Sequence, residues 1–474
     1  MDTKKLRQKI LDLAIHGKLV PQDPNDEPAS VLLERIKAEK ERLIKEGKIK
    51  RSKKSAKTSD TPHYENVPFD IPENWVWTDI EHICSKIGSG STPRGSNYSS
   101  KGIPFFRSQN IYNGGLVYED IKFISEEVHQ TMIGTEVLPN DLLLNITGGS
   151  LGRCAVVPEN FQRGNVSQHV CIMRPIFVVS EYFHAFVLSS IFSKSIKITG
   201  SGREGLPKYN LERMFFPLPP LSEQHRIVSE IENRFALIDQ IEQGKLDLQK
   251  VIKKAKNKIL DFAIHGKLVP QDPNDEPAIE LLKRINPDFT PCDNGHYENL
   301  PDSWCLIDIK SIFKINPKNK VTDDVIAGFV PMTNIADGYS NECRFESKLW
   351  SDIKKGFTHF AEGDIVVAKI SPCLENRKSA IVTSLPNGIG AGTTELFVFR
   401  SQCVLPEYGL YFFKSDLFIN HCVGTFNGVV GQQRVSKSII ESIKFPLPPI
   451  SEQKRIVDAI HTAFAKLDAI TESL

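Results

Sequence analysis

The chain lacks a surplus of charge of either sign. Its 474 residues include 59 lysines and arginines against 58 aspartates and glutamates, a formal net charge of +1. Bulk electrostatics therefore gives no argument for a nucleic-acid or other charged partner. Long apolar runs are also missing, so we expect no membrane insertion. The amino-terminal MDTKKLRQKILDLAIHG is amphipathic rather than a charged stub before an apolar block, so we expect no export.

Cysteines are few and have no metal-binding spacing. The nine lie scattered at residues 84, 154, 171, 292, 305, 343, 373, 403 and 422, without a C-x-x-C pair. Buried, reduced thiols in a cytoplasmic protein are the expected state. The length of the chain favours two to four domains.

The chain does contain a repeat. Residues 9–29, KILDLAIHGKLVPQDPNDEPA, recur at 258–278 with one change, and 216–228, FPLPPLSEQHRIV, recur at 445–457 as FPLPPISEQKRIV. Between these anchors lie two inserts of about 150 residues with little obvious likeness. A duplicated frame therefore carries two diverged inserts.

The order of the anchors is circular. In the middle of the chain FPLPP leads into one long segment that ends in His-Gly-Lys-Leu-Val-Pro, whereas at the ends this unit is split. By the repeat offsets, Leu474 corresponds to Lys245 and Met1 to Lys250. If the two terminal pieces dock as the central segment folds, the molecule has pseudo-two-fold symmetry and nearly adjacent termini.

The central segment 222–264 is predicted to be a helix. Ser222 is the expected N-cap, Glu223 gives an acidic first turn, Gly266 marks the end and Gly244 is a possible bend. An apolar heptad stripe predicts antiparallel pairing with the terminal segments; it comprises Ile227, Ile231, Ile238, Ile241, Leu248, Ile252, Ala255, Ile259 and Phe262.

A second helix is predicted over Ala29 to Glu46. The basic run Lys48 to Lys57, directly after it, is either a solvated linker or a contact to a phosphate backbone.

Each insert reads as a compact α/β domain with short strands and with helices over 181–197 and 407–420. The expected fold class is α+β or α/β, with two globular domains joined by a pair of long antiparallel helices in a pseudo-two-fold, circularly permuted repeat. The predicted parts are a repeated region at 1–62, the first domain at 63–215, a central repeated region at 216–295, the second domain at 296–444, and a carboxy-terminal repeated region at 445–474.

The permuted repeat, the two dissimilar inserts and the FPLPP-x-SEQ-x-RIV helix starts together resemble the specificity subunit of type I restriction-modification enzymes. The resemblance covers the whole chain. It implies that the inserts are target-recognition domains, each reading one half of a split, asymmetric target in double-stranded DNA. The helices would set the spacing between the halves, and the repeated regions would hold two methyltransferase subunits, which restriction subunits then join. S-adenosylmethionine, ATP and Mg²⁺ would belong to those partners, so we expect no cofactor on this chain.

Machinery for chemistry is missing from the sequence. It has no Asn/Asp-Pro-Pro-aromatic motif of DNA adenine methyltransferases and no Walker A loop. Gly200-x-Gly202-x-x-Gly205 is a lone, weak match to a dinucleotide fingerprint, and Pro207 comes directly after it. His16 and His265 are expected to be structural rather than metal ligands. We therefore expect a non-catalytic subunit. The alternatives are a coiled-coil scaffold with protein-binding inserts and a stand-alone DNA-modifying enzyme.

Candidate DNA-reading residues are loop side chains of the types that best read base edges. A solvated loop residue or a structural hydrogen bond is the alternative for each. In the first insert they are Arg94, Arg107, Ser108, Gln109, Asn110, Arg153, Gln168 and Arg203; in the second they are Thr333, Asn334, Lys369, Arg377, Thr393, Thr394, Gln432, Gln433 and Arg434.

Candidate partner-binding residues come from the surfaces that are present twice and nearly unchanged. They are Phe216, Pro217, Leu218, Pro219 and Pro220, with Phe445, Pro446, Leu447, Pro448 and Pro449.

Overall fold

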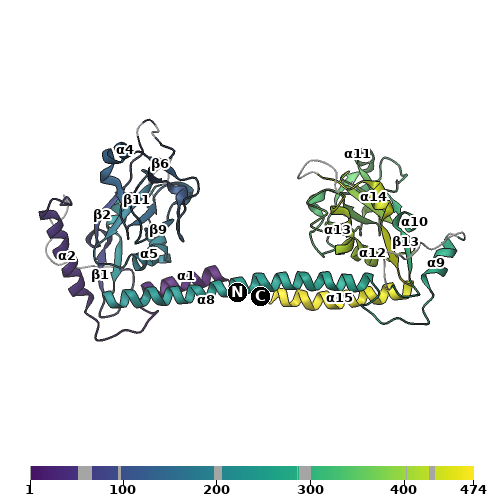
Figure 1. Ribbon diagram of the computed structural model, residues 1–474, viewed down its shortest axis with the longest axis horizontal. Coiled ribbons are helices and arrows are strands. Elements are labelled where there is room, and N and C mark those ends of the chain that lie inside the picture. The colour runs from purple at the N-terminus through teal and green to yellow at the C-terminus, as the bar shows by residue number, and fades with distance from the viewer. Residues whose placement is uncertain are drawn as a thin grey trace. The chain divides into compact units, whose positions relative to one another are not determined.

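A computed structural model describes the chain at residues 2–51, 67–93, 95, 98–196, 205–285, 287, 300–401, 403–425 and 433–473. The chain divides into two compact units, Met1–Gly244 and Lys245–Leu474 (Figure 1). Within the described residues, no helix combines the length and the apolar character needed to cross a membrane.

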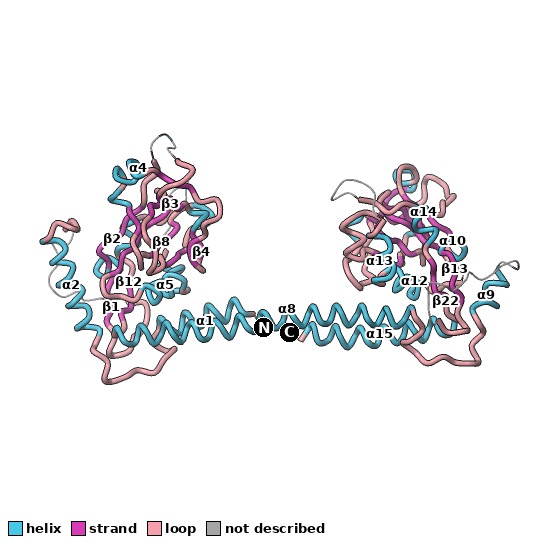
Figure 2. Tube along the Cα trace, in the orientation of Figure 1, coloured by secondary structure: helices cyan, strands magenta, loops and turns pink. Residues whose placement is uncertain are grey.

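Unit 1 combines helices from the repeated regions with a mixed insert (Figure 2). Its helices are α1 (Thr3–Ile15), α2 (Ala29–Lys45), α3 (Ile80–Ile83), α4 (Glu126–Thr131), α5 (Ser180–Leu188), α6 (Ser190–Ser195), α7 (Lys208–Glu212) and the first part of α8 (Leu221–Ile264). Its strands are β1 (Val76–Asp79), β2 (Cys84–Ser89), β3 (Ile103–Phe106), β4 (Ile111–Tyr112), β5 (Gly115–Leu116), β6 (Lys122–Ile124), β7 (Glu136–Val137), β8 (Leu142–Asn145), β9 (Cys154–Val156), β10 (Gly164–Val166), β11 (Val170–Pro175) and β12 (Phe215–Leu218).

Unit 2 repeats this order of elements, except that its described residues have no strand pair in the place of β4 and β5. After the end of α8 come the helices α9 (Ala278–Ile285), α10 (Ile309–Ile312), α11 (Trp350–Ile353), α12 (Pro406–Phe413), α13 (Asp416–Val423), α14 (Lys437–Ser442) and α15 (Ile450–Glu472). The strands are β13 (Cys305–Asp308), β14 (Lys314–Ile315), β15 (Ile326–Val330), β16 (Glu346–Leu349), β17 (Thr358–Ala361), β18 (Ile365–Ala368), β19 (Ser379–Ile381), β20 (Ile389–Gly392), β21 (Leu396–Arg400) and β22 (Lys444–Leu447).

The inserts, which look unrelated in sequence, have the same sheet topology. One sheet runs β6-β3-β10-β7 in unit 1 and β16-β15-β20-β17 in unit 2, and a second runs β2-β11-β8-β9 and β14-β21-β18-β19. In both units the first sheet has one parallel pair, β3–β10 or β15–β20, and the remaining pairs are antiparallel. The duplication therefore includes the inserts.

A buried ion pair occupies the same place in both inserts. Asp141, fully buried before β8, accepts hydrogen bonds of 2.7 and 2.8 Å from Arg174 of β11. Asp364, before β18, accepts two of 2.7 Å from Arg400 of β21. Each carboxylate also accepts a backbone N–H three residues earlier in the chain. A buried carboxylate is tolerated when it is paired and hydrogen-bonded in this way.

The predicted antiparallel pairing of the helices is present within each unit, and the permuted repeat is confirmed. In unit 1, Arg7 of α1 lies 2.6 Å from Asp239 of α8, and Gln22 beyond α1 reaches Glu223 near the start of α8. In unit 2, Lys256 of α8 lies 2.5 Å from Asp468 of α15, and Gln271 reaches Glu452. The end of α8 therefore takes the role of α1, and α15 takes the role of the start of α8.

Two details of the long helix differ from the expectation: its start and its buried stripe. The helix begins at Leu221, and the Ser222 hydroxyl donates to Asp26 rather than capping the helix. Ile241 and Phe262 of the predicted stripe are 40% and 39% exposed. Near its end α8 buries Leu260, Ala263 and Ile264 instead, because it packs against the insert as well as against a second helix. The helix continues through Gly244.

The predicted helices 181–197 and 407–420 are each split in two by a serine. The Ser189 hydroxyl accepts from the N–H of Phe192 and caps α6, and the Ser415 hydroxyl accepts from that of Phe418 and caps α13. Of the basic run, only its first four residues are described; Lys48 lies 2.8 Å from Glu46, and Arg51 lies 2.6 Å from Glu41.

A tryptophan–glutamate hydrogen bond joins helix to insert in each unit. Trp75 Nε1 donates to Glu223 at 2.9 Å, and Trp304 Nε1 donates to Glu452 at 2.9 Å. Both carboxylates are fully buried. Burial raises the pKa of Glu223 and of Glu452, although the hydrogen bonds from tryptophan and glutamine act in the opposite direction.

The turn after α1 requires glycine for two separate reasons. Gly17 has φ +66°, and a Cβ there would lie 2.4 Å from Pro72 Cγ. The backbone N–H of Lys18 reaches back to the carbonyl of Leu13, which completes a Schellman-type helix end. Gly266 has the same geometry against Pro301 in unit 2.

We expect Gly17→Ala to lower the free energy of unfolding by about 2–4 kcal/mol, because the left-handed backbone and the clash with Pro72 both add to the cost. Gly47→Ala is the matched control, since Gly47 has φ +70° with nothing within 4 Å of the added Cβ. It should cost about 1–2 kcal/mol. Denaturant unfolding of the full chain measures both, and equal losses would contradict the proposed clash.

The buried carboxylates give the stability of the units a pH dependence. In the unfolded chain, Glu223 and Glu452 lose their protons near the usual glutamate pKa of 4.5. In the folded chain the same two carboxyl groups keep their protons to a higher pH. The free energy of unfolding should therefore fall as the pH rises from 4.5 through the raised pKa values. The double variant E223Q/E452Q should flatten this dependence, whereas E34Q, on the exposed face of α2, should leave it unchanged. Denaturation followed by tryptophan fluorescence tests this, and equal slopes for wild type and double variant would contradict it.

Candidate functional site

The candidate site of unit 1 lies at one edge of its first sheet. The carboxyl ends of parallel neighbours meet at the same edge, so the loops after β3 and β10 emerge together. The backbone N–H of Ser167 donates to the carbonyl of Phe106 at 2.9 Å and holds the two loops in register. Asn145, at the end of β8, donates its side-chain amide to the carbonyl of Ser108 at 2.9 Å. Three strand ends from two sheets therefore position one group of loops.

These loops line a concavity of about 560 Å³ that is open to solvent. It is lined by Thr92, Tyr98, Arg107, Ser108, Gln109, Tyr112, Ser150, Arg153, Ser167, Gln168 and His169. The lining includes two arginines and no acidic side chain. A cluster of hydrogen-bond donors without a carboxylate suits a ligand that presents acceptors.

Five residues predicted from the sequence to read DNA line this concavity together: Arg107, Ser108, Gln109, Arg153 and Gln168. Arg94 and Arg203 lie outside the described residues. For all seven residues, a role in DNA binding stays a prediction.

Asn110 has a structural role instead. It is fully buried, its Oδ1 accepts from the N–H of Arg107, and its amide donates to the carbonyls of Val117 and Glu119. These bonds fix the loop that carries its neighbours, and they leave the side chain no access to a ligand.

Six residues of the lining were not predicted from the sequence: Thr92, Tyr98, Tyr112, Ser150, Ser167 and His169. Tyr112 carries the guanidinium of Arg153 4.8 Å from its ring centroid, and Tyr98 is 36% exposed. Ser167 directly precedes the predicted Gln168 and lies at the end of β10. Exposed tyrosines close to arginine-rich loops were the available signal for the aromatic pair.

The same sheet edge in unit 2 carries most of the residues predicted there. Thr393 comes after β20 as Ser167 comes after β10, and its N–H donates to the carbonyl of Val330 at 3.3 Å. Thr394 is exposed beside it, and Thr333 and Asn334 lie in the short turn after β15. The residue types chosen in the two dissimilar inserts therefore fall on equivalent loops.

Unit 2 neutralises its cations at this edge. Arg434 lies 2.9 Å from Glu395, and its hydrogen bond holds the pKa of Glu395 below its usual value. Lys369 lies over the Phe397 ring, 5.5 Å from the centroid, and Gln433 bonds through its backbone carbonyl to Ser371. Gln432 lies outside the described residues. The edge of unit 2 thus presents hydroxyls and an ion pair where unit 1 presents arginines.

Arg377, also predicted to read DNA, is a structural residue. It is 7% exposed, has φ +60°, and donates to the carbonyl of Lys414 and to Asp416. Lys414 is itself buried and donates to the carbonyls of Gly338 and Arg377, and burial lowers its pKa to about 7. These groups satisfy one another inside the unit.

The predicted partner-binding residues are not surface residues. All ten are buried: Phe216, Pro217, Leu218, Pro219 and Pro220 in unit 1, and Phe445, Pro446, Leu447, Pro448 and Pro449 in unit 2. The first three residues of each set lie in β12 and β22, which pair with β1 and β13. The carbonyls of Pro217 and Pro446 accept from the hydroxyls of Tyr182 and Tyr408. The motif repeats because it builds the same joint twice, and its buried side chains are not accessible to a partner.

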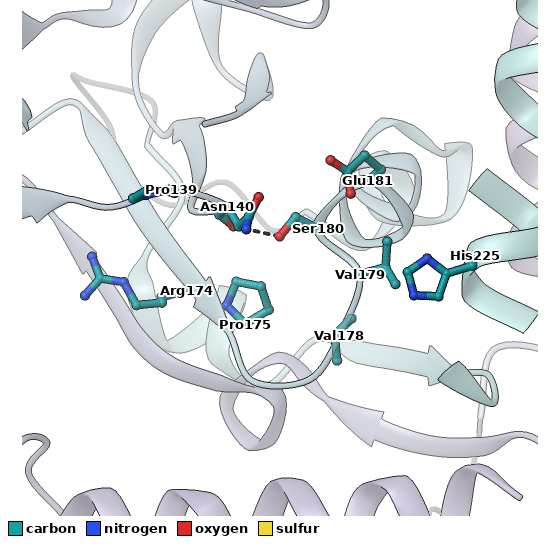
Figure 3. A pocket seen from close by; sticks show the side chains of 9 residues that line it. All are labelled: Pro139, Asn140, Arg174, Pro175, Val178, Val179, Ser180, Glu181 and His225. Atoms are coloured by element: carbon teal, nitrogen blue, oxygen red, sulfur yellow. Dashed lines mark hydrogen bonds between the residues drawn. The ribbon is translucent and has the colours of Figure 1, made fainter. Parts of the chain in front are cut away.

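A second hollow of about 330 Å³ in unit 1 lies beside Arg174 and His225 (Figure 3). Arg174 is paired with Asp141, and the Ser180 hydroxyl donates to the carbonyl of Asn140 at 2.7 Å. These groups are bonded within the unit, and the hollow lies away from the sheet edge described above. Among the described residues, no three His, Cys, Asp or Glu side chains gather as metal ligands.

The chain is similar to known specificity subunits. It is 45% identical over 233 residues to the specificity subunit of the type I restriction enzyme EcoAI of Escherichia coli, over 45% of this chain and 39% of the relative. It is 42% identical over 251 residues to that of EcoEI, also from Escherichia coli, over 49% of this chain and 41% of the relative. The chain thus aligns with about two fifths of the length of these two relatives.

The fold is known from a solved structure described as the complex assembly and conformational transition of the type I R-M system. The match has a TM-score of 0.57 at 15% identity and covers 86% of this chain and 94% of that chain. The family model of the type I restriction modification DNA specificity domain matches residues 72–250 and 301–474. With both units matched, the chain belongs to the type I restriction-modification DNA specificity family.

Proposed function

We propose that this chain is the DNA-specificity subunit of a type I restriction-modification complex. Each unit reads one half of a split, asymmetric target in double-stranded DNA through the sheet edge described above. The observation that carries the proposal is the contrast between the two edges: equivalent loops on one topology hold arginines in unit 1 and threonines with an Arg–Glu ion pair in unit 2. Two readers of one shape and different chemistry suit a target whose halves differ.

The chain itself carries out no catalytic step in this proposal. It positions two methyltransferase subunits and the restriction subunits, which supply S-adenosylmethionine, ATP and Mg²⁺ chemistry, in the cytoplasm where the DNA lies. The two alternatives to this proposal are a scaffold with protein-binding inserts and an enzyme that modifies DNA alone.

The surface for two identical partners has a candidate in an exposed duplicated loop. Residues 21–28 and 270–277 both read PQDPNDEP and are largely exposed. Asp26 is paired with Arg226, and Asp275 with Arg455, each at 2.6 Å, so both copies are held in the same way. Two identical, rigid surfaces can seat two identical subunits.

We expect replacement of residues 64–215 by the corresponding domain of another family member to change one half of the methylated target and leave the other half intact. The inserts are separate modules, so each should carry its own specificity. The measurement is methylome sequencing of cells that express the chimera with the methyltransferase. Replacing residues 297–444 is the matched experiment and should change the other half. A swap that altered both halves would contradict independent readers, and a wild-type complex without any sequence preference would favour the scaffold.

We expect four residues inserted after Gly244 to lengthen the spacer of the target by one base pair. The insertion lengthens α8 by about 6 Å and turns the part of the helix beyond it by about 400°, a net of roughly 40°. One base pair advances a site by about 3.4 Å and turns it by roughly 35°. A two-residue insertion turns the apolar stripe by about 200° and should reduce activity. Mapping the methylated sites of both variants tests this; an unchanged spacer in an active four-residue variant would show that α8 does not set the spacing.

A further inference from the structure

The concavity of unit 1 has the chemistry of a site for one particular base. We propose that it takes the major-groove edge of a guanine and that Arg153 is the residue that reads it. This inference rests on the proposed function, since it names the substrate group at the same site.

Arg153 is prepared for bidentate donation. Its guanidinium lies over the Tyr112 ring, 4.8 Å from the centroid, and Tyr112 belongs to the β4–β5 hairpin, so a cation–π contact to a strand residue holds the fork in place. No ion pair to Arg153 occurs among the described residues, and no carboxylate lines the concavity. Its donors therefore stay available for O6 and N7 of guanine, the pairing that a guanidinium fork fits best.

Arg107 plays a different part in the same concavity. One of its terminal nitrogens donates to the carbonyl of Asp120 at 2.8 Å, which anchors the side chain. Its Nε is buried and has no hydrogen-bond partner among the described residues. Arg107 is thus a positioning residue that adds positive potential behind the reader.

Ser167 gives an independent sign that the concavity holds a polar ligand. Its side chain lines the concavity, the residue is only 4% exposed, and its Oγ has no hydrogen-bond partner among the described residues. A buried hydroxyl without a hydrogen-bond partner destabilises the unit that holds it, so the free unit gains nothing from this group. A base edge seated in the concavity would supply the partner.

A base edge fits the lining better than a backbone phosphate does. The lining contains no lysine, the usual point charge for a phosphate, and is rich in amides and hydroxyls, which discriminate donors from acceptors. Gln109 and Gln168 are exposed at its rim and can bond the same pair or its neighbour.

Unit 2 has no such reader at the equivalent position among its described residues. Lys378 precedes β19 as Arg153 precedes β9, and the carbonyls of both accept from the last residue of the neighbouring strand, Ala368 or Asn145. Lys378 Nζ donates to the carbonyl of Ile335 at 2.6 Å and lies 3.6 Å from Asp337. Because Lys378 bonds to groups of its own unit, it should not read a base. We therefore expect no guanine in the other half-target to be read from this position.

The test is the methylated motif of cells that express the full chain with its methyltransferase, compared between wild type and R153A. R153A should relax one guanine position in the half-target read by unit 1, with discrimination against the other bases falling on the order of 10- to 100-fold, and should leave every other position intact. R153K keeps the charge but loses the fork, so it should also relax that position. R163A is the matched control, because Arg163 is paired with Glu126 in the same unit and does not line the concavity, so its motif should be unchanged.

Three outcomes would overturn the inference. An unchanged motif in R153A would show that Arg153 reads nothing. A uniform loss of methylation without relaxation at any position would identify a phosphate contact. Relaxed base discrimination in the half-target read by unit 2 would show that Arg153 does not read a base of the half-target assigned to unit 1. A wild-type complex without any motif would instead refute the proposed function itself.

Ser167 provides a second measurement that does not depend on Arg153. S167A should leave the free chain as stable as wild type or more stable, because it removes a hydroxyl that has no partner among the described residues, and should weaken binding of the complex to a duplex carrying its methylated motif. A less stable free chain with unchanged DNA binding would show that Ser167 has a purely structural role.

Discussion

The hydrogen bond between a buried tryptophan and a buried glutamate is the contact on which each unit depends. Trp75 precedes the first strand of the insert and Glu223 lies in the first turn of α8, so one bond fixes the insert on the helix that supports it. Trp304 and Glu452 repeat the bond at the same distance in unit 2. Both carboxylates are buried at the cost of a raised pKa, and the neighbouring Asp–Arg pairs hold the adjoining loops. The reading edges can diverge because this joint does not.

The two edges show how one scaffold can support two specificities. Parallel strands bring their carboxyl ends to one place in both inserts, and backbone bonds fix the loops there whatever their side chains are. In unit 1 the loops carry arginines over a concavity that has no acidic lining and contains a buried hydroxyl. In unit 2 an arginine is held by Glu395 and the equivalent lysine is taken up by backbone carbonyls. The difference in recognition therefore lies in which donors each unit leaves available.

The buried FPLPP segments show that repetition in a sequence can reflect either a shared surface or a shared core. The motif was assigned to partner binding because it occurs twice, but its prolines and phenylalanines lie inside the units, where strand pairing and the hydroxyls of Tyr182 and Tyr408 use its backbone. The duplicated loop at 21–28 and 270–277, in contrast, is largely exposed.

The sequence alone predicts the permuted repeat, the antiparallel helices and the family resemblance, because each depends on local periodicity or on identity between distant segments. From residue type alone it also proposed five of the residues that line the concavity of unit 1. The shared topology of the two inserts is visible only in the folded chain, because different side chains can satisfy the same strand pairings. The structure also distinguishes Arg153, whose side chain can reach a ligand, from Arg377 and Asn110, whose side chains bond to groups inside their own unit. Those roles depend on which atoms meet across strands far apart in the chain, and residue type alone does not carry that information.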